Sequence, residues 1–201
     1  MCETIDDKIL ASIKKCGRGT VFLGNDYITY GTRSAVNKTL ERMARDGVII
    51  RVARGIYCYP KIEKVYGLGP VPPSIGEIAR AVARRDGAKI IPAEAWAQNQ
   101  LGLSQQVPMN YVYLTNGAGR SIETADGVQI KFKHASPRYF TMKDMQACLI
   151  STALKDWKIE NLTEEQIERL RKVVVEHGEY PVEDLKLMPS AARELVMSFL
   201  K

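Results

Sequence analysis

The sequence has no long apolar run and no paired cysteines, and each absence excludes a class of protein. No stretch approaches the 18 apolar residues of a membrane-spanning helix, so we expect no transmembrane segment. The opening MCETIDDKIL is acidic and lacks the apolar core of a secretory signal, so we expect a cytoplasmic protein. The four cysteines are scattered without a CxxC pair, a pattern typical of reduced thiols and not of a zinc site or disulfide framework.

The sequence also lacks catalytic motifs. HExxH, the P-loop and the nucleophile elbow are all absent. The acidic pairs Glu164–Glu165 and Glu183–Asp184 resemble solvated helix starts, and Cys148 falls on an apolar helical face that predicts a buried thiol. The glycine-rich NGAGR, residues 116–120, is interpreted as a hairpin turn. We therefore predict a protein that is not an enzyme and that uses no metal or other cofactor.

What the sequence does have is positive charge, and this charge is unevenly distributed. The net charge is +6 over 201 residues. Residues 1–60 hold ten Lys and Arg against six Asp and Glu, whereas residues 151–201 hold eight against ten. A basic front and a slightly acidic tail predict different partners for the two ends of the chain.

Two helices are predicted near the start. Ile5, Ile9 and Ile13 recur at helical spacing across residues 4–15. VFLGNDYI, which begins at residue 21, then predicts a short helix or a turn. A longer helix follows, with Thr32 as its N-cap and Gly47 just beyond its end.

A hairpin is predicted directly after this helix. Residues 48–50 and 56–57 are apolar and read as two short strands, with residues 52–55 as the turn. Helix, short helix, longer helix and hairpin is the order of a winged helix-turn-helix. In that fold the third helix enters the major groove of DNA and the hairpin lies along the backbone or minor groove.

The candidate DNA-binding residues lie on the outer face of the longer helix and on the hairpin. Small and amide side chains allow close approach to base edges, and basic side chains contact phosphates. The predicted contacts are Arg33, Ser34, Asn37, Lys38 and Arg42 on the helix, and Arg51 and Arg54 on the hairpin.

The second part of the chain alternates strands and helices. YGLGPVPPS, residues 66–74, predicts a linker, which divides the chain into a winged helix at 1–65 and a second domain at 66–201. Ser74 and Glu77 have capping-box spacing, and GVQIKFKHA predicts a strand. From Met142 the chain looks helical, including residues 142–157. The expected fold is α+β: an N-terminal winged helix followed by a mixed α/β domain that ends in helices.

Three segments resemble a known family. GTRSAVNKTLERMARDGVIIRVARGIYCYP, residues 31–60, and the segment 93–116 with its GLSQQVP resemble the AbiEi-like antitoxins of type IV toxin–antitoxin systems. IKFKHASPRYF, residues 130–140, is a weaker match. The resemblance implies that the winged helix binds double-stranded operator DNA and represses its own operon. It also implies an antitoxic C-terminal domain and a nucleotidyltransferase-like toxin as partner.

Other functions remain open at this point. A standalone regulator without a toxin would have the same winged helix, as would a ligand-sensing regulator or a winged helix that binds only protein. The C-terminal domain is short and carries no antitoxic motif that the resemblance maps. No coiled-coil seam that would indicate a dimer is present.

Overall fold

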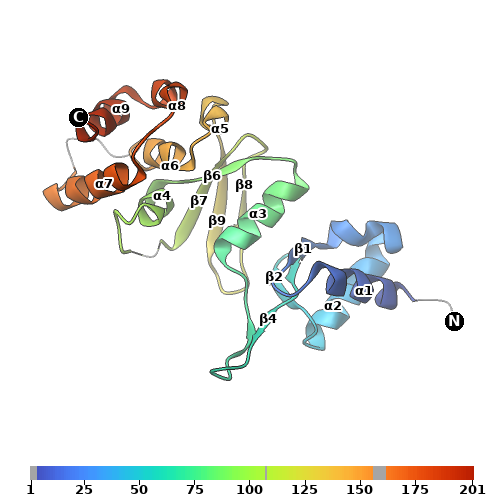
Figure 1. The fold of residues 1–201 in the computed structure, drawn as a ribbon. Coiled ribbons are helices and arrows are strands. Elements are labelled where there is room, and N and C mark those ends of the chain that lie inside the picture. Colours follow the sequence, from blue (N-terminus) through green and yellow to red (C-terminus); the bar gives the residue numbers. More distant parts are fainter. Residues whose placement is uncertain (1–3, 107, 156–161) are drawn as a thin grey trace. The chain divides into compact units, whose positions relative to one another are not determined.

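The chain folds as a mixed α+β protein with helices at both ends (Figure 1). The computed structural model describes residues 4–106, 108–155 and 162–201. Two compact units are formed: Met1–Gly87 with Ile122–Val128, and Ala88–Ser121 with Gln129–Lys201. The boundary that the sequence placed between residues 65 and 66 falls inside the first of these units. In the described ranges, every helix is too short or too polar to cross a membrane.

The first unit begins with helices separated by a short strand. The elements are α1 (Ile5–Cys16), β1 (Val21–Leu23), the 3-10 helix η1 (Gly24–Tyr30) and α2 (Arg33–Arg45). VFLGNDYI is therefore a strand followed by a 3-10 helix, a finer division than the predicted short helix or turn. Thr32 caps α2 as predicted, because its side chain accepts a hydrogen bond from the Ala35 N–H.

The predicted hairpin exists, but its first strand starts later than expected. β2 (Ile50–Ala53) and β3 (Ile56–Cys58) pair with β1 in an antiparallel sheet of order β1-β3-β2. Val48 and Ile49 are not part of the strand, because their N–H groups donate to the Met43 carbonyl and close the end of α2. The turn therefore consists of Arg54 and Gly55 alone, and Gly55 has a φ of 71°.

The helices and the sheet of the first unit share one apolar core. Its members are Ile9, Ile13, Phe22, Tyr27, Val36, Leu40, Met43, Ile49 and Tyr57. A further helix, α3 (Ile75–Arg85), packs against β1, and the Arg84 guanidinium donates to the Val21 carbonyl over 3.0 Å. The predicted capping box of Ser74 and Glu77 at its start is confirmed.

The predicted linker is wrong in part, since it contains a strand. β4 (Lys61–Glu63) pairs in antiparallel fashion with β5 (Gly69–Val71), so residues 61–71 form a second hairpin. Proline is compatible with this pairing because Pro70 stands on an edge strand of a two-stranded ribbon. The prolines and glycines of residues 66–74 favoured a linker, whereas the hydrogen bonds from the loop backbone to the Glu63 carboxylate favour a hairpin.

The second unit contains a four-stranded sheet of order β6-β7-β9-β8. Its strands are β6 (Ile90–Ala93), β7 (Asn110–Thr115), β8 (Arg120–Glu123) and β9 (Gln129–His134). β7 and β9 are parallel neighbours. The interpretation of residues 116–120 as a hairpin turn is wrong, because they connect β7 to β8 and these strands are not adjacent in the sheet.

Helices cover this sheet and complete the second core. They are α4 (Glu94–Gln100), α5 (Arg138–Thr141), α6 (Met145–Ala153), α7 (Glu164–His177), α8 (Val182–Leu187) and α9 (Ser190–Phe199). α4 and α6 pack against β6, and α7 packs against α9. Thr163 and Gln166 form the predicted capping box at the start of α7. The last two residues of the helix predicted at 142–157 lie outside the described residues.

Between β8 and β9 the chain returns to the first unit. The Ala125 N–H donates to the Val52 carbonyl over 2.8 Å, and Thr124 forms an isolated antiparallel bridge with Ala53. Within residues 122–128, Thr124 and Ala125 thereby pair with β2, the outer strand of the order β1-β3-β2. The edge of this sheet is covered by a segment that is distant in the sequence.

Candidate nucleic-acid interface

The α2 helix presents one apolar face to the core and one polar face to solvent. Val36, Thr39, Leu40 and Met43 are buried at helical spacing against the core of the first unit. The opposite side consists of exposed polar and charged side chains, as the sequence predicted. The buried face of α2 therefore stabilises the fold, whereas its exposed face is available to contact a partner.

All seven predicted DNA contacts are exposed. They are Arg33, Ser34, Asn37, Lys38 and Arg42 on α2, and Arg51 and Arg54 on the β2–β3 hairpin. Within the described ranges, Arg33, Lys38, Arg51 and Arg54 have no carboxylate within ion-pair distance. These four side chains can therefore contact phosphate without first breaking an ion pair.

Arg42 differs from the other six because it already has a partner. Its guanidinium forms an ion pair with the Asp6 carboxylate at the start of α1. The second Asp6 oxygen accepts a hydrogen bond of 2.7 Å from the Thr39 hydroxyl. Arg42 and Thr39 thus connect α2 to α1. No local pattern predicts this pairing, because Asp6 lies 36 residues from Arg42.

The hairpin and α2 meet around the buried ring of Tyr57. Arg51 stands opposite Tyr57 in the β2–β3 register. Burial raises the pKa of the Tyr57 hydroxyl, while the charge of Arg51 lowers it and that of Glu41 raises it. Arg51 on β2 and Glu41 on α2 therefore lie near the same hydroxyl group, which brings the base of the hairpin close to the polar face of the helix.

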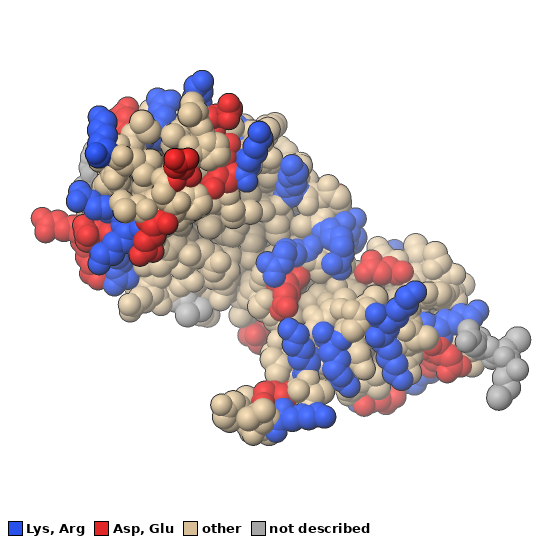
Figure 2. Space-filling view, in the orientation of Figure 1, with Lys and Arg blue, Asp and Glu red and all other residues tan. Residues whose placement is uncertain are grey.

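Basic side chains also gather on the visible surface of the first unit. Figure 2 shows Lys and Arg side chains next to one another over the region of α1 and α2. Lys8, Lys14 and Lys15 of α1 are exposed and add to the charge of α2. These three lysines are not among the predicted DNA contacts, although their place in a regular helix could have indicated them.

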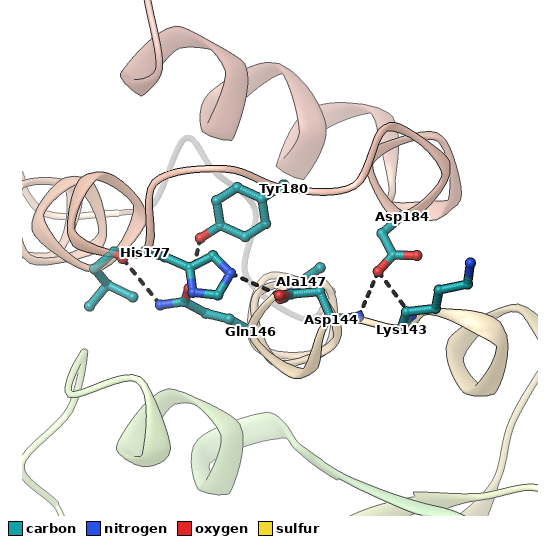
Figure 3. A network of polar contacts seen from close by, with 8 residues as sticks. Lys143, Asp144, Gln146, Ala147, His177, Tyr180 and Asp184 are labelled. Atoms are coloured by element: carbon teal, nitrogen blue, oxygen red, sulfur yellow. Dashed lines mark hydrogen bonds and ion pairs between the residues drawn. The ribbon is translucent and has the colours of Figure 1, made fainter.

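Charges in the second unit have a different use, because they hold the helices together (Figure 3). Asp184 of α8 is 1% exposed, and its carboxylate accepts the N–H groups of Lys143 and Asp144 over 2.9 and 2.7 Å. Asp144 in turn caps α6 through the Ala147 N–H and contacts His177 Nε2 over 2.8 Å. The interpretation of Glu183–Asp184 as a solvated helix start is therefore wrong for Asp184.

A second set of bonds continues this network. The Tyr180 hydroxyl donates to Gln146 Oε1 over 3.0 Å, and Gln146 Nε2 donates to the Val173 carbonyl over 3.1 Å. Gln146 and His177 also line an open groove of about 470 Å³, together with apolar residues that include Leu101 and Leu149. The network thus joins α6, α7 and α8, and three of its polar side chains, those of Asp144, Gln146 and His177, line the groove together with Gln100.

The buried thiols are unsuited to nucleophilic chemistry. Burial raises the pKa of Cys148 to about 11, with the charges of Asp184 and Asp144 adding to the effect. Burial likewise raises the pKa of Cys58 in β3 to about 11. Both thiols are therefore protonated at neutral pH. In the part of the chain that the structure describes, no three His, Cys, Asp or Glu side chains could hold a metal ion together.

The chain belongs to the DUF6088 family, a family of unknown function, whose model matches residues 8–180. The match extends across both units of the fold. No curated protein matches the chain.

Proposed function

We propose that this protein is a DNA-binding transcriptional regulator whose first unit is a winged helix. The order α1, β1, η1, α2, β2, β3 with a sheet of order β1-β3-β2 supports this proposal, since a winged helix has a helix, a helical turn, a recognition helix and a hairpin in this sequence. In this proposal α2 enters the major groove, and the β2–β3 hairpin contacts the adjacent backbone.

The strongest support for DNA binding is the set of exposed, unpaired basic side chains on α2 and on the β2–β3 hairpin. The polar face of α2 and the hairpin expose Arg33, Lys38, Arg51 and Arg54, which have no acidic partner among the described residues. Ser34 and Asn37 lie beside them on the helix, where small and amide groups can reach base edges. A solvated surface would not require a cluster of unpaired arginines beside short polar side chains.

The biological role that we propose is the autorepressing antitoxin of a type IV toxin–antitoxin system. The resemblance of residues 31–60 to AbiEi-like antitoxins supports this role, and it implies a nucleotidyltransferase-like toxin as a partner of the second unit. The protein would act by binding and not as an enzyme. Its DNA ligand would be the operator of its own operon.

The test is a fluorescence-anisotropy titration with duplex DNA from upstream of its own gene. A scrambled duplex is the control, and both are measured at two salt concentrations. We expect tighter binding to the upstream duplex and affinities that fall steeply with salt. Absence of binding to either duplex at low salt would contradict the proposal and would direct attention to protein partners.

A ligand-sensing regulator is a second candidate, favoured by the groove that Gln146 and His177 line in the second unit. A groove of this volume, lined by four apolar and four polar side chains, is of the size that small ligands occupy. Thermal shifts with a metabolite panel would test this candidate. A ligand that stabilises the wild type and not Gln146→Ala would establish it.

A further inference from the structure

The end of the β4–β5 hairpin exposes apolar side chains that a folded protein ordinarily buries. Val65, Tyr66 and Leu68 are 83%, 81% and 72% exposed. They are consecutive along the tip except for Gly67, so they form one small apolar surface. Figure 2 shows the tip as a projection of the first unit whose end is uncharged, with acidic and basic side chains directly beside it. Clustered exposure of this kind indicates contact with a partner.

The hairpin holds these side chains in place through its own backbone contacts. The Glu63 carboxylate accepts the N–H groups of Val65, Tyr66 and Leu68 over 2.6, 2.8 and 3.3 Å. Three bonds from one side chain fix the turn in one conformation before any partner binds. Both carboxylate oxygens are thus directed toward the loop backbone.

The base of the hairpin is attached firmly to the first unit. The Gly19 N–H donates to the Tyr59 carbonyl over 2.6 Å, and the Tyr59 N–H donates to the Thr20 carbonyl over 3.0 Å. The Arg18 guanidinium donates to the Pro60 carbonyl over 2.9 Å and stacks 4.6 Å from the centre of the Tyr59 ring. The apolar tip therefore stands at the end of an anchored hairpin, residues 61–71, which we call the arm.

The charge around the tip is positive. Lys61 and Lys64 are exposed on either side of Glu63, and no described carboxylate lies within ion-pair distance of them. Because Glu63 faces inward, the outer surface of the arm combines two ammonium groups with apolar side chains. An anionic partner with an apolar recess matches this surface.

We propose that the β4–β5 hairpin is a second DNA contact, which inserts Tyr66 and Leu68 into the minor groove while Lys61 and Lys64 contact the flanking phosphates. This inference rests on the proposed DNA-binding function. A three-residue strand spans about 10 Å, which is enough to reach across a minor groove roughly 6 Å wide and 7.5 Å deep. Apolar wedges of this type unstack a base step and bend the duplex.

A second copy of this chain fits the arm less well than DNA does. One aromatic and two aliphatic side chains fall far short of the roughly 800 Å² per partner that a stable interface buries. Two arms that met tip to tip would also bring four lysines together. DNA meets both features of the arm, since it offers phosphates for the lysines and sugar and base surfaces for the apolar tip.

The test compares the full chain with the double variant Tyr66→Ala/Leu68→Ala. Anisotropy titrations with the upstream duplex measure affinity at two salt concentrations, and a duplex labelled at both ends measures bending by energy transfer. We expect the variant to lose about tenfold in affinity, as the burial of one or two side chains implies, and to lose most of the bending. The salt dependence should stay unchanged, since no charge is removed.

Two further variants separate the contribution of the lysines from that of the apolar tip and control for loss of exposed apolar side chains elsewhere. Lys61→Gln/Lys64→Gln should leave bending largely intact and reduce the salt slope by about two units. Met109→Ala/Val182→Ala removes apolar side chains that are 80% and 62% exposed in the second unit, and it should change nothing. Circular dichroism checks that each variant is folded.

The outcomes distinguish this inference from the function on which it rests. If the wild type binds no duplex, the proposed function fails and the inference fails with it. If the wild type binds DNA and the tip variant binds and bends it equally well, the inference alone is overturned. If sedimentation shows a wild-type dimer that the tip variant dissociates, the arm is a self-association surface and the minor-groove contact is wrong.

Discussion

The two units of this protein use their charged residues in opposite ways. In the first unit Arg33, Lys38 and Arg54 stand on the surface with no acidic partner among the described residues. In the second unit Asp184 is buried, and it holds the chain at Lys143 and Asp144 through their backbone N–H groups. Removal of these exposed basic side chains should leave the first unit folded, whereas the second unit depends on the buried Asp184 carboxylate.

This difference separates charges that bind from charges that support the fold. A buried carboxylate is stable only while its hydrogen bonds are satisfied, so its removal exposes unpaired donors. An exposed arginine contributes little to stability, and its removal affects only what it contacts in a complex. Substitution of Asp184 should therefore reduce stability, whereas substitution of an exposed, unpaired arginine of the first unit should reduce DNA binding.

The largest expected effect is on stability, from Asp184→Ala. The substitution removes the buried acceptor of two N–H groups, those of Lys143 and Asp144, and we expect the second unit to lose on the order of 3 kcal/mol of unfolding free energy. Denaturation followed by tryptophan fluorescence measures this loss, since both tryptophans come after residue 88. DNA affinity measured under native conditions should not change.

Two controls accompany this variant. Asp184→Asn retains one acceptor oxygen and should cost less than the alanine variant, while the exposed neighbour Glu183→Ala should cost almost nothing. Thiol labelling reports each unit separately, because Cys148 lies in the second unit and Cys58 in the first. If Asp184→Ala exposed both thiols equally, the two units would not be independent in stability.

Asn37→Ala should mainly reduce the discrimination between DNA sequences. An amide that pairs with adenine contributes about 1–3 kcal/mol of preference for its base. The upstream duplex should therefore bind less tightly while the scrambled duplex is almost unaffected. An equal loss on both duplexes would instead place Asn37 at a phosphate, and Gln100→Ala in the second unit serves as the matched amide control.

Arg54→Ala should weaken binding to every duplex by a similar factor. The side chain stands at the turn of the β2–β3 hairpin, where we expect it to contact phosphate and not a base. The slope of log affinity against log salt should fall by about one unit. Lys172→Ala removes an exposed positive charge from α7 and is the matched control; an unchanged slope for Arg54→Ala would remove the hairpin from the interface.

Arg42→Ala should have the smallest effect on stability and on DNA affinity. It tests a side chain that could serve both purposes, DNA binding and support of the fold. Arg42 belongs to the predicted interface but forms an ion pair with Asp6 on the surface, and exposed pairs contribute below about 1 kcal/mol. We expect a slight loss of stability and a smaller loss of DNA affinity than for Arg54→Ala. A loss of affinity larger than that for Arg54→Ala would show that Arg42 exchanges Asp6 for phosphate on binding.

Sequence reasoning succeeded where local chemistry decides the structure. The caps at Thr32, Ser74 and Thr163 depend on residues three positions apart, and the apolar face of α2 depends on helical spacing, so each was predictable. The polar face of α2 and its exposed residues follow from the same spacing. Local pattern therefore predicted most helices and the helical half of the candidate interface.

Sequence reasoning failed where the structure depends on which side chain meets which backbone group, whether the two are near or far apart in the sequence. Glu63 organises the hairpin tip through three backbone N–H groups, and nothing in the composition of residues 66–74 indicates this. Asp184 is buried because Lys143 and Asp144, about 40 residues earlier, need an acceptor. The prediction of a hairpin turn at residues 116–120 was wrong because β9 lies between β7 and β8 in the sheet. The residues of a connecting loop do not indicate the order of the strands.

The return of residues 122–128 to the first unit affects how the protein can be divided. The chain passes from one unit to the other three times, after Gly87, Ser121 and Val128. A fragment that ends at residue 87 would lack Ala125, which pairs with Val52, and would expose the edge of β2 to other chains. A single proteolytic cut would leave the units tethered. Neither unit can therefore be excised as one continuous stretch of sequence. To complete the first unit, a fragment of residues 1–87 would need residues 122–128, either as a separate peptide or joined through a redesigned loop.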